Sequence, residues 1–139
     1  MSASRSFKFI AIGLLIWNLI GVAAFAMQYG ADLAALAKSD PYTARIFAEM
    51  PDWAWAAYAV AVGAGTAGAM LLLLRKAAAV ALFALSMVAV VMQFGYSFLG
   101  TDLWAVKGAV AAVFPAVIFA IAVGQLFYAV RLRARGVLR

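Results

Sequence analysis

The sequence predicts an all-α integral membrane protein, a bundle of four transmembrane helices with both termini on the cytoplasmic side. Three observations lead to this prediction. The chain of 139 residues is 69% hydrophobic and 12% charged, whereas soluble domains are about half apolar and a quarter charged. Its apolar residues are gathered into four blocks, each near the roughly 20 residues that a membrane-spanning helix needs. Its basic residues lie at the ends of these blocks, so a single four-helix domain, residues 1–139, is expected.

The first apolar block predicts a span at about Phe9–Tyr29. It follows a basic start and contains Ala24-Phe25-Ala26, a pattern typical of signal-peptide cleavage sites. The block is longer than the apolar core of an ordinary signal peptide. We therefore expect a retained first membrane helix.

The longest connection, Gly30–Asp52, carries helix signals of its own. Asp40 followed by Pro41 is typical of a helix start, and Pro51 with Asp52 marks a stop followed by a new N-cap. Apolar residues recur between them at helical spacing: Tyr42, Ile46, Phe47 and Met50. A short amphipathic helix in the first external loop is expected. It either caps a ligand site or, as we favour, lies at the interface and covers helix ends.

The second and third spans are predicted at Trp53–Leu74 and Ala77–Phe98, joined by a tight hairpin at Arg75-Lys76. The second contains G-x-G-x-x-G, formed by Gly63, Gly65 and Gly68. This pattern binds dinucleotides only between a strand and a helix, and here it lies inside an apolar span. Small residues in a membrane helix let another backbone approach closely. The three glycines are therefore predicted to be helix-packing positions.

The fourth span is predicted at Leu103–Val130. Pro115 lies inside it and is expected to kink the helix, because proline removes one backbone hydrogen bond. Lys107 lies one turn inside the outer end and is expected to extend its ammonium group to the interface.

The charges predict which ends of the spans are cytoplasmic. One side carries eight of the eleven Lys and Arg residues and no acid: Arg5, Lys8, Arg75, Lys76, Arg131, Arg133, Arg135 and Arg139. The other side carries three basic residues and all five acids. Because cytoplasmic loops are enriched in Lys and Arg, the first side is expected to be cytoplasmic. Multi-pass insertion in a membrane is predicted.

Several kinds of chemistry find no support in the composition. Cysteine and histidine are both absent, which removes the thiolate and imidazole nucleophiles, bases and metal ligands. The acids of the external loop lack the spacing of a cation-binding loop. The basic residues flank apolar blocks instead of forming a patch for nucleic acid. We therefore expect no catalytic residues, no metal, no cofactor and no nucleic-acid partner.

Neutral polar residues predict a seam through the membrane. Asn18 and Gln28 lie on one arc of the first span, and Ser86 and Gln93 on one line of the third. These four residues, with Trp17 as a surface for stacking, are the candidate ligand-binding residues. The alternative, which we favour, is that they form interhelical hydrogen bonds that hold the bundle together.

Five short motifs together resemble a family of small four-helix bacterial inner-membrane proteins that often carry the label of sugar transporter. They are Trp17-Asn18-x-x-Gly21, Met27-Gln28-Tyr29, Glu49-Met50-Pro51-x-Trp53, Gly65-x-x-Gly68 before Leu71–Leu74, and Gln93. The resemblance covers almost the whole chain. It implies a bacterial origin and a transport role, and supplies no catalytic residues.

Two functions are therefore expected from the sequence. The first is a non-enzymatic transporter or binding component for a neutral polar small molecule such as a sugar. The alternative is a structural or accessory subunit that packs against a larger membrane complex. Because four helices enclose little space, the partners expected besides the lipid bilayer are further copies of the chain or a larger membrane protein.

Overall fold

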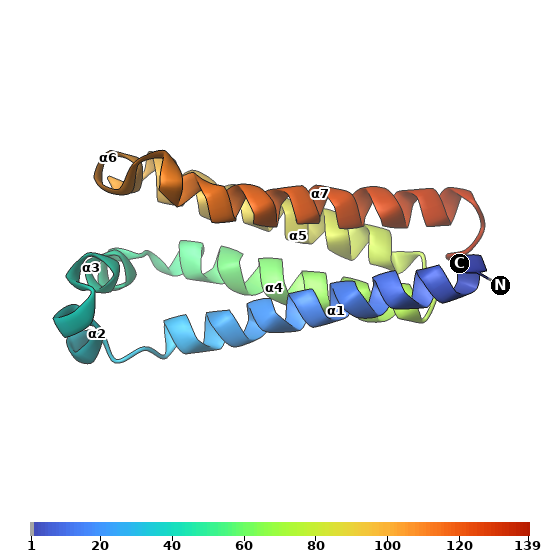
Figure 1. Cartoon of the computed structure of the whole chain (residues 1–139), viewed down its shortest axis with the longest axis horizontal. Helices are drawn as coiled ribbons and strands as arrows, with labels where there is room; N and C mark the ends of the chain where they lie inside the picture. Colours follow the sequence, from blue (N-terminus) through green and yellow to red (C-terminus); the bar gives the residue numbers. More distant parts are fainter. Residues whose placement is uncertain (1) are drawn as a thin grey trace.

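The computed structural model describes residues 2–139, with side chains from residue 5 onward, and contains helices but no strands in that range. Four long helices form the body: α1 (Ser2–Tyr29), α4 (Asp52–Leu73), α5 (Ala78–Leu99) and α7 (Val113–Ala134) (Figure 1). Four helical segments, with α7 counted from Leu103, are long and apolar enough to cross a membrane. The chain thus has the features of a multi-pass membrane protein, as predicted.

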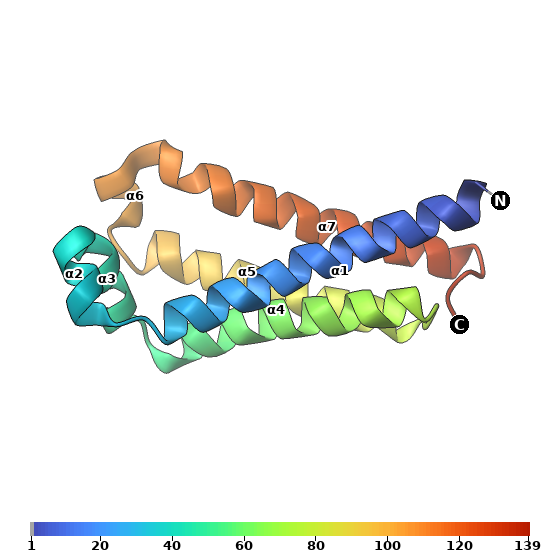
Figure 2. The same cartoon turned by 60° about the horizontal axis from the view of Figure 1, so that its bottom comes forward.

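The four long helices are packed unevenly. Helix α4 packs against α1 and α5, and α5 packs in turn against α7. Helices α1 and α7 lie close at the end where the chain begins and ends, and diverge toward the other end (Figure 2). We call the first the terminal end and the second, which carries α2, α3 and α6, the loop end. This divergence leaves room for a cavity.

The face of α4 inside the bundle is built from small residues. They recur every three or four positions and are buried: Ala54, Ala57, Ala61, Ala64, Gly65, Gly68 and Ala69. A Cβ atom added at Gly68 would lie 2.8 Å from the ring of Phe83 on α5. Gly63 is exposed instead, and a Cβ there would meet no atom within 4 Å. The close packing predicted for the three glycines is therefore found at Gly65 and Gly68 and not at Gly63.

The terminal half of the bundle is filled by a packed apolar core. Its buried members come from all four long helices and the segment after α7: Phe7, Ala11, Ala69, Leu72, Ala79, Phe83, Ala129, Leu132 and Leu138. Phe83 and Leu72 are fully buried. Because lipid is as apolar as these side chains, the core stabilises the bundle by close van der Waals contact.

The long connection forms two helices, α2 (Leu33–Ser39) and α3 (Pro41–Glu49). The helix predicted to start at Asp40-Pro41 is present as α3, and α2 was not predicted. Asp32 caps α2 by accepting hydrogen bonds from the backbone of its first turn. Asp40 ends α2 and caps α3 by accepting from Thr43 N at 3.1 Å. The N-cap of α4 is Pro51, one residue before the predicted Asp52, which lies in the first turn.

The fourth apolar segment is broken, at a residue that was not predicted. Helix α6 (Leu103–Lys107) is followed by the 3₁₀ helix η1 (Gly108–Ala112), and α7 begins at Val113. Gly108 has φ of 73°, a conformation that favours glycine. Pro115 lies in the first turn of α7, a position that proline tolerates. The break in the helix lies before it, at Gly108–Ala112. With 22 residues, α7 alone is about 33 Å long, enough to span a bilayer.

Helices α4 and α7 end in the same way at the terminal end. Arg75 follows α4 with φ of 60°, and Gly136 follows α7 with φ of 78°. In each case the next backbone N–H donates to a carbonyl five residues earlier, at Leu71 and Leu132, as in a Schellman motif. Arg139 N donates to the Arg75 carbonyl at 2.9 Å. The segment after α7 is thereby fixed to the α4–α5 turn.

Candidate functional site

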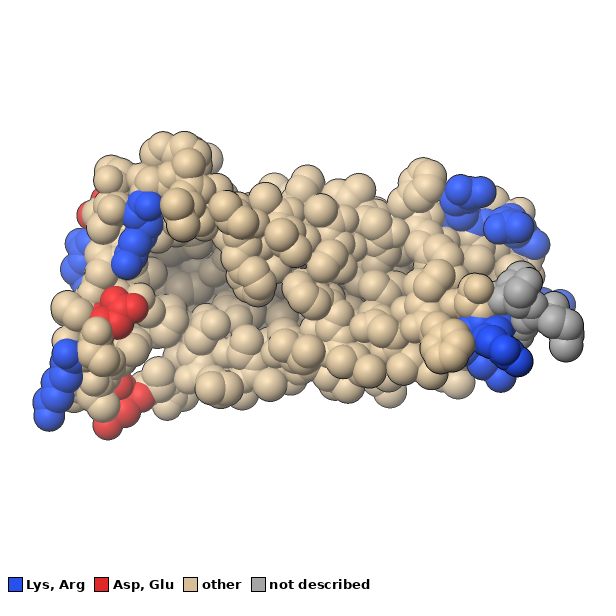
Figure 3. Space-filling view, viewed as in Figure 1, with Lys and Arg blue, Asp and Glu red and all other residues tan. Residues whose placement is uncertain are grey.

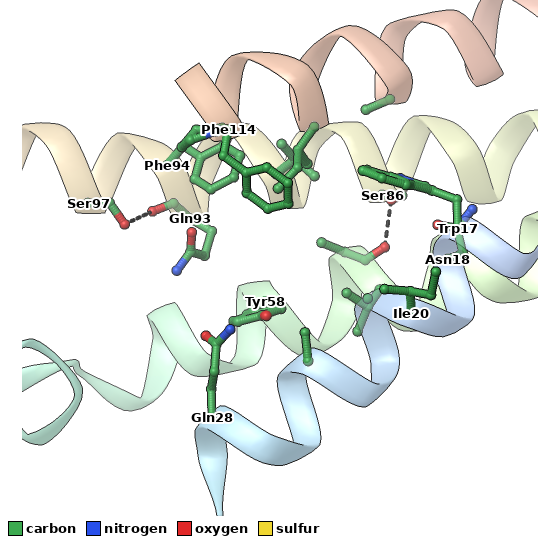
Figure 4. Close-up of a pocket in the computed structure, with 18 of the residues that line it drawn as sticks. Trp17, Asn18, Ile20, Gln28, Tyr58, Ser86, Gln93, Phe94, Ser97 and Phe114 are labelled. Atoms are coloured by element: carbon green, nitrogen blue, oxygen red, sulfur yellow. Dashed lines mark hydrogen bonds between the residues drawn. The ribbon is translucent and has the colours of Figure 1, made fainter. Parts of the chain in front are cut away.

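A cavity of about 360 Å³ occupies the loop-end half of the bundle (Figures 3 and 4). Side chains from α1, α4, α5 and α7 line it, together with residues of α3 and α6. No Lys, Arg, Asp or Glu is among its lining residues. Its polar groups are neutral: Asn18, Gln28, Tyr58, Ser86, Gln93, Ser97 and Gln125. Its volume lies within the range of small-molecule sites.

The deep end of the cavity is a cluster of three buried polar side chains, which we call the amide floor: Asn18, Ser86 and Gln125. Their exposed fractions are 7%, 3% and 4%. Asn18 Nδ2 donates to Gln125 Oε1 at 3.2 Å and to the Leu14 carbonyl at 2.7 Å. Ser86 Oγ donates to the Ala61 carbonyl at 2.6 Å. The floor thus links α1 to α7 and α5 to α4, where an unpaired polar group would be costly.

The amide floor depends on the missing side chain of Gly65. A Cβ atom there would lie 3.1 Å from Asn18 Cγ, closer still to Asn18 Oδ1, and 3.3 Å from Ser86 Oγ. The Asn18 amide therefore occupies space that any other residue at 65 would fill. Gly65 therefore makes room for the polar side chain of Asn18, in addition to the helix packing that was predicted from its spacing.

A second set of polar groups lies nearer the loop end. Gln28 on α1 lies beside the hydroxyl of Tyr58 on α4, and the Gln93 side chain on α5 points across the cavity toward them (Figure 4). Ser97 Oγ donates to the backbone carbonyl of Gln93 at 3.1 Å. Among the described residues, no hydrogen bond uses the side-chain amide of Gln93. Its hydrogen-bonding groups therefore face the cavity without a protein partner.

Aromatic rings form much of the wall between the two polar sets. Trp17, Phe94 and Phe114 line the cavity, as does Phe47 from α3. Phe47 also makes an edge contact with Trp55, at 5.6 Å between ring centroids. The cavity therefore combines an apolar wall with hydrogen-bonding groups at two depths.

Helix α3 covers the loop end of the cavity and is tied to α6. Ile46 and Phe47 of α3 line the cavity, as does Met50, which directly follows the helix. On its other side, Arg45 Nη2 contacts both carboxylate oxygens of Asp102, at 3.0 and 3.1 Å. The Tyr42 hydroxyl donates to the same carboxylate at 2.9 Å. We call Tyr42, Arg45 and Asp102 the latch.

The latch is a charged cluster in an exposed position. Hydrogen bonds from Arg45 and Tyr42 lower the pKa of Asp102 below its ordinary value, and the Asp102 hydrogen bond raises the pKa of Arg45. Burial and then the Asp102 hydrogen bond raise the pKa of Tyr42. Lys107 Nζ lies 5.4 Å from the centre of the Tyr42 ring. Since the Arg45 and Asp102 side chains are about half exposed, solvent screens the pair and it holds α3 weakly.

All five predicted ligand-binding residues line this cavity: Trp17, Asn18, Gln28, Ser86 and Gln93. They do not form one continuous seam, because Asn18 and Ser86 lie in the floor while Gln28 and Gln93 lie nearer the loop end. The prediction missed Gln125, which is the Asn18 partner. The sequence could have indicated Gln125, because it is the one carboxamide residue in the fourth apolar segment.

The arrangement is suited to binding an uncharged molecule. Among the described residues, no group of three Asp or Glu side chains is placed to hold a metal ion. Comparisons with protein-family models, curated proteins and solved structures found no match to this chain. The resemblance to small four-helix inner-membrane proteins therefore stays a prediction, and the proposals below depend on the geometry of the cavity.

Proposed function

We propose that this chain is a non-enzymatic, multi-pass protein of the bacterial inner membrane that binds a neutral polar small molecule as a transport or binding component. The observation that carries the proposal is the uncharged cavity with its amide floor. Burying a charged ligand there would be costly without a counter-charge. Hydroxyl and carbonyl groups, by contrast, match the side-chain amides of Asn18, Gln93 and Gln125.

The proposed orientation places the loop end outside and the terminal end in the cytoplasm. Figure 3 shows Lys and Arg at both ends of the molecule, acids only at the loop end and an uncharged band between them. This distribution supports an N-in, C-in arrangement, because the side with the excess of basic residues faces the cytoplasm.

Hydrogen-bonding groups without a protein partner occur both at the amide floor and nearer the loop end of the cavity. Gln125 is 4% exposed and lines the cavity, and its Oε1 accepts from Asn18. Among the described residues, no hydrogen bond uses the Nε2 group of Gln125. Because every fully buried side-chain nitrogen and oxygen among the described residues has a partner, this nitrogen keeps some contact with open space. A ligand oxygen that enters the cavity could accept from it.

The packing at the terminal end supports a binding site instead of an open pore. The cavity ends at the amide floor, and beyond it lie the core residues Phe83 and Leu72, which are fully buried. Transport would require this core to rearrange or a second chain to contribute a path. The proposal therefore assigns the structure to a state that is closed at the terminal end.

The accessory-subunit alternative receives less support from the structure. Its sequence argument was the small-residue face of α4, which a partner helix could approach closely. That face is buried within the chain itself, because Gly68 packs on Phe83 of α5 and Gly65 lies against Asn18 of α1. Self-association or a larger partner stays possible only through other surfaces, and the size of the purified particle tests it.

Gln93→Leu is the variant that tests the proposed function. Because the Gln93 amide has no described protein partner, the change should abolish binding of the neutral molecule that the wild type binds, while leaving the melting temperature of the unliganded protein unchanged. Thr66→Val is the matched control, since Thr66 lies outside the cavity and bonds only its own helix, at Val62. Binding is measured by thermal shift in detergent with a panel of neutral molecules that includes glucose, glycerol and a monoacylglycerol.

The Gln93→Leu experiment has a contrary outcome that is easy to recognise. If Gln93→Leu lowers the melting temperature as much as Asn18→Leu does, the polar groups near the loop end are structural. If no neutral solute or lipid shifts the wild-type melting temperature, the cavity is not a binding site.

A further inference from the structure

We infer that the ligand is a neutral amphiphile that enters sideways from the outer leaflet, through the gap between α1 and α7. This inference rests on the proposed function and names its substrate class: a molecule with hydroxyl or carbonyl oxygens on an apolar body. Three features of the structure point to this ligand: the gap, the cover at the loop end and the placement of the polar groups.

The gap begins where the contact between α1 and α7 ends. The two helices are joined midway by the hydrogen bond from Asn18 to Gln125 and then diverge toward the loop end (Figure 2). Among the described residues, no hydrogen bond or ion pair joins them beyond that point. Ile20 on α1 and Phe114 on α7 line the cavity and are also 60% and 64% exposed. These residues therefore mark an opening on the side of the bundle, at a depth that faces lipid tails.

The end of the bundle that faces water is covered by apolar side chains. Ile46 and Phe47 of α3 and its C-cap Met50 lie over the cavity, and the latch ties α3 to α6. A water-soluble solute would have to displace α3, whereas a membrane-dissolved molecule meets an opening that already exists. The bilayer also concentrates an amphiphile beside this opening, since apolar surface favours transfer out of water.

The polar groups select the kind of amphiphile. Gln125 lines the deep end of the cavity, and no hydrogen bond between described residues uses its Nε2 group, so a ligand oxygen beside it would find a donor. Around it the walls are mostly apolar and aromatic, including Trp17 and Phe94. A molecule that is polar all round would leave several hydroxyl groups without partners, which costs free energy. An apolar body with one or two oxygens satisfies both conditions.

The test uses a monoacylglycerol that carries a photoreactive diazirine in its acyl chain, with the protein in phosphatidylcholine nanodiscs. Labelling should reach residues of the cavity wall, and unlabelled monoolein should compete with it while glycerol and glucose should not. Ile20→Trp should reduce this labelling several-fold by filling the gap. The matched control is Ile16→Trp, because Ile16 is 53% exposed one turn away and lies outside the cavity.

A second variant distinguishes a blocked gap from a general folding defect. Phe114→Ala widens the gap from the α7 side and should increase labelling, the opposite direction to Ile20→Trp. Both variants are compared with wild type by melting temperature before labelling. An Ile20→Trp protein that folds normally and labels like Ile16→Trp would overturn the lateral route.

The remaining outcomes separate this inference from the proposed function. If monoolein does not compete, but glucose or glycerol binds and Gln93→Leu abolishes that binding, the ligand enters from water. The inference then fails and the proposed function stands. If neither the amphiphile nor any neutral solute binds, both fail together.

Discussion

Replacing Gly65 with alanine tests whether the amide floor depends on one missing methyl group. The added Cβ would lie 3.1 Å from Asn18 Cγ and 3.3 Å from Ser86 Oγ. Asn18 must move away, and its hydrogen bond to Gln125 must lengthen or break. Helices α1, α4, α5 and α7 all meet at this point, so the backbone has little freedom to yield.

Two contributions determine how much Gly65→Ala should lower the free energy of unfolding. Losing a hydrogen bond between membrane helices costs about 0.6–1.7 kcal/mol, and forcing an extra methyl group into a packed site costs about 1–3 kcal/mol. The free energy of unfolding should therefore fall by roughly 2–4 kcal/mol relative to a glycine-to-alanine change without a clash. Gly63→Ala is that control, because it lies two residues away on the same helix with open space around its Cβ. Both changes gain the same helix propensity, about 1 kcal/mol.

The measurement is equilibrium unfolding in mixed micelles of dodecyl sulfate and a mild detergent, followed by circular dichroism. Gly65→Ala should unfold at a clearly lower dodecyl sulfate fraction than Gly63→Ala. A double variant with Asn18→Ala should recover most of the loss attributed to the clash, since the obstructed side chain is then gone. Equal unfolding of Gly65→Ala and Gly63→Ala would refute the account of the floor.

Three further predictions concern the ends of the bundle. Because the Arg45 hydrogen bond lowers the pKa of Asp102 below its ordinary value, the latch should hold α3 at neutral pH and be lost only as the pH falls through that lowered pKa. Asp102→Asn should raise amide exchange in α3 at neutral pH, and unchanged exchange would contradict the latch. Gly136→Ala should destabilise the chain by about 1 kcal/mol through its left-handed backbone, whereas Gly124→Ala, also in open space, should not, as thermal melting would show. A reporter after the last residue should read cytoplasm and a tag near Lys38 should read outside, and the reverse result would refute the proposed orientation.

The sequence predicted the number and places of the long helices because each apolar block is long and uninterrupted. It predicted α3 from Asp40-Pro41, whose capping and fixed φ act locally. It missed α2, since Leu33–Ser39 looks like the continuation of an apolar loop until Asp32 is seen to cap it. It also placed the break of the fourth segment at Pro115, although proline costs little in a first turn and Gly108 turns the chain.

The site was harder to predict, because a cavity depends on how helices diverge. Asn18, Ser86 and Gln93 could be singled out, since neutral polar groups are rare in apolar spans and need partners. Which partner each one finds depends on tertiary packing. Asn18 bonds Gln125 across 107 positions of sequence, and Gly65 makes room for it, a relation that no spacing within one helix reveals. Gly63 shows the converse, since its spacing suggested packing and its position faces outward.

The hydrogen bond between Asn18 and Gln125 lies at the boundary between the cavity in the loop-end half of the bundle and the packed core in the terminal half. In the proposed lateral entry, α1 and α7 would separate only on the loop side of this hydrogen bond, while the core around Phe83 stays packed. A molecule could then be loaded or released without a water-filled path through the protein. In the proposed orientation, the membrane would keep its proton gradient and electrical potential throughout each exchange.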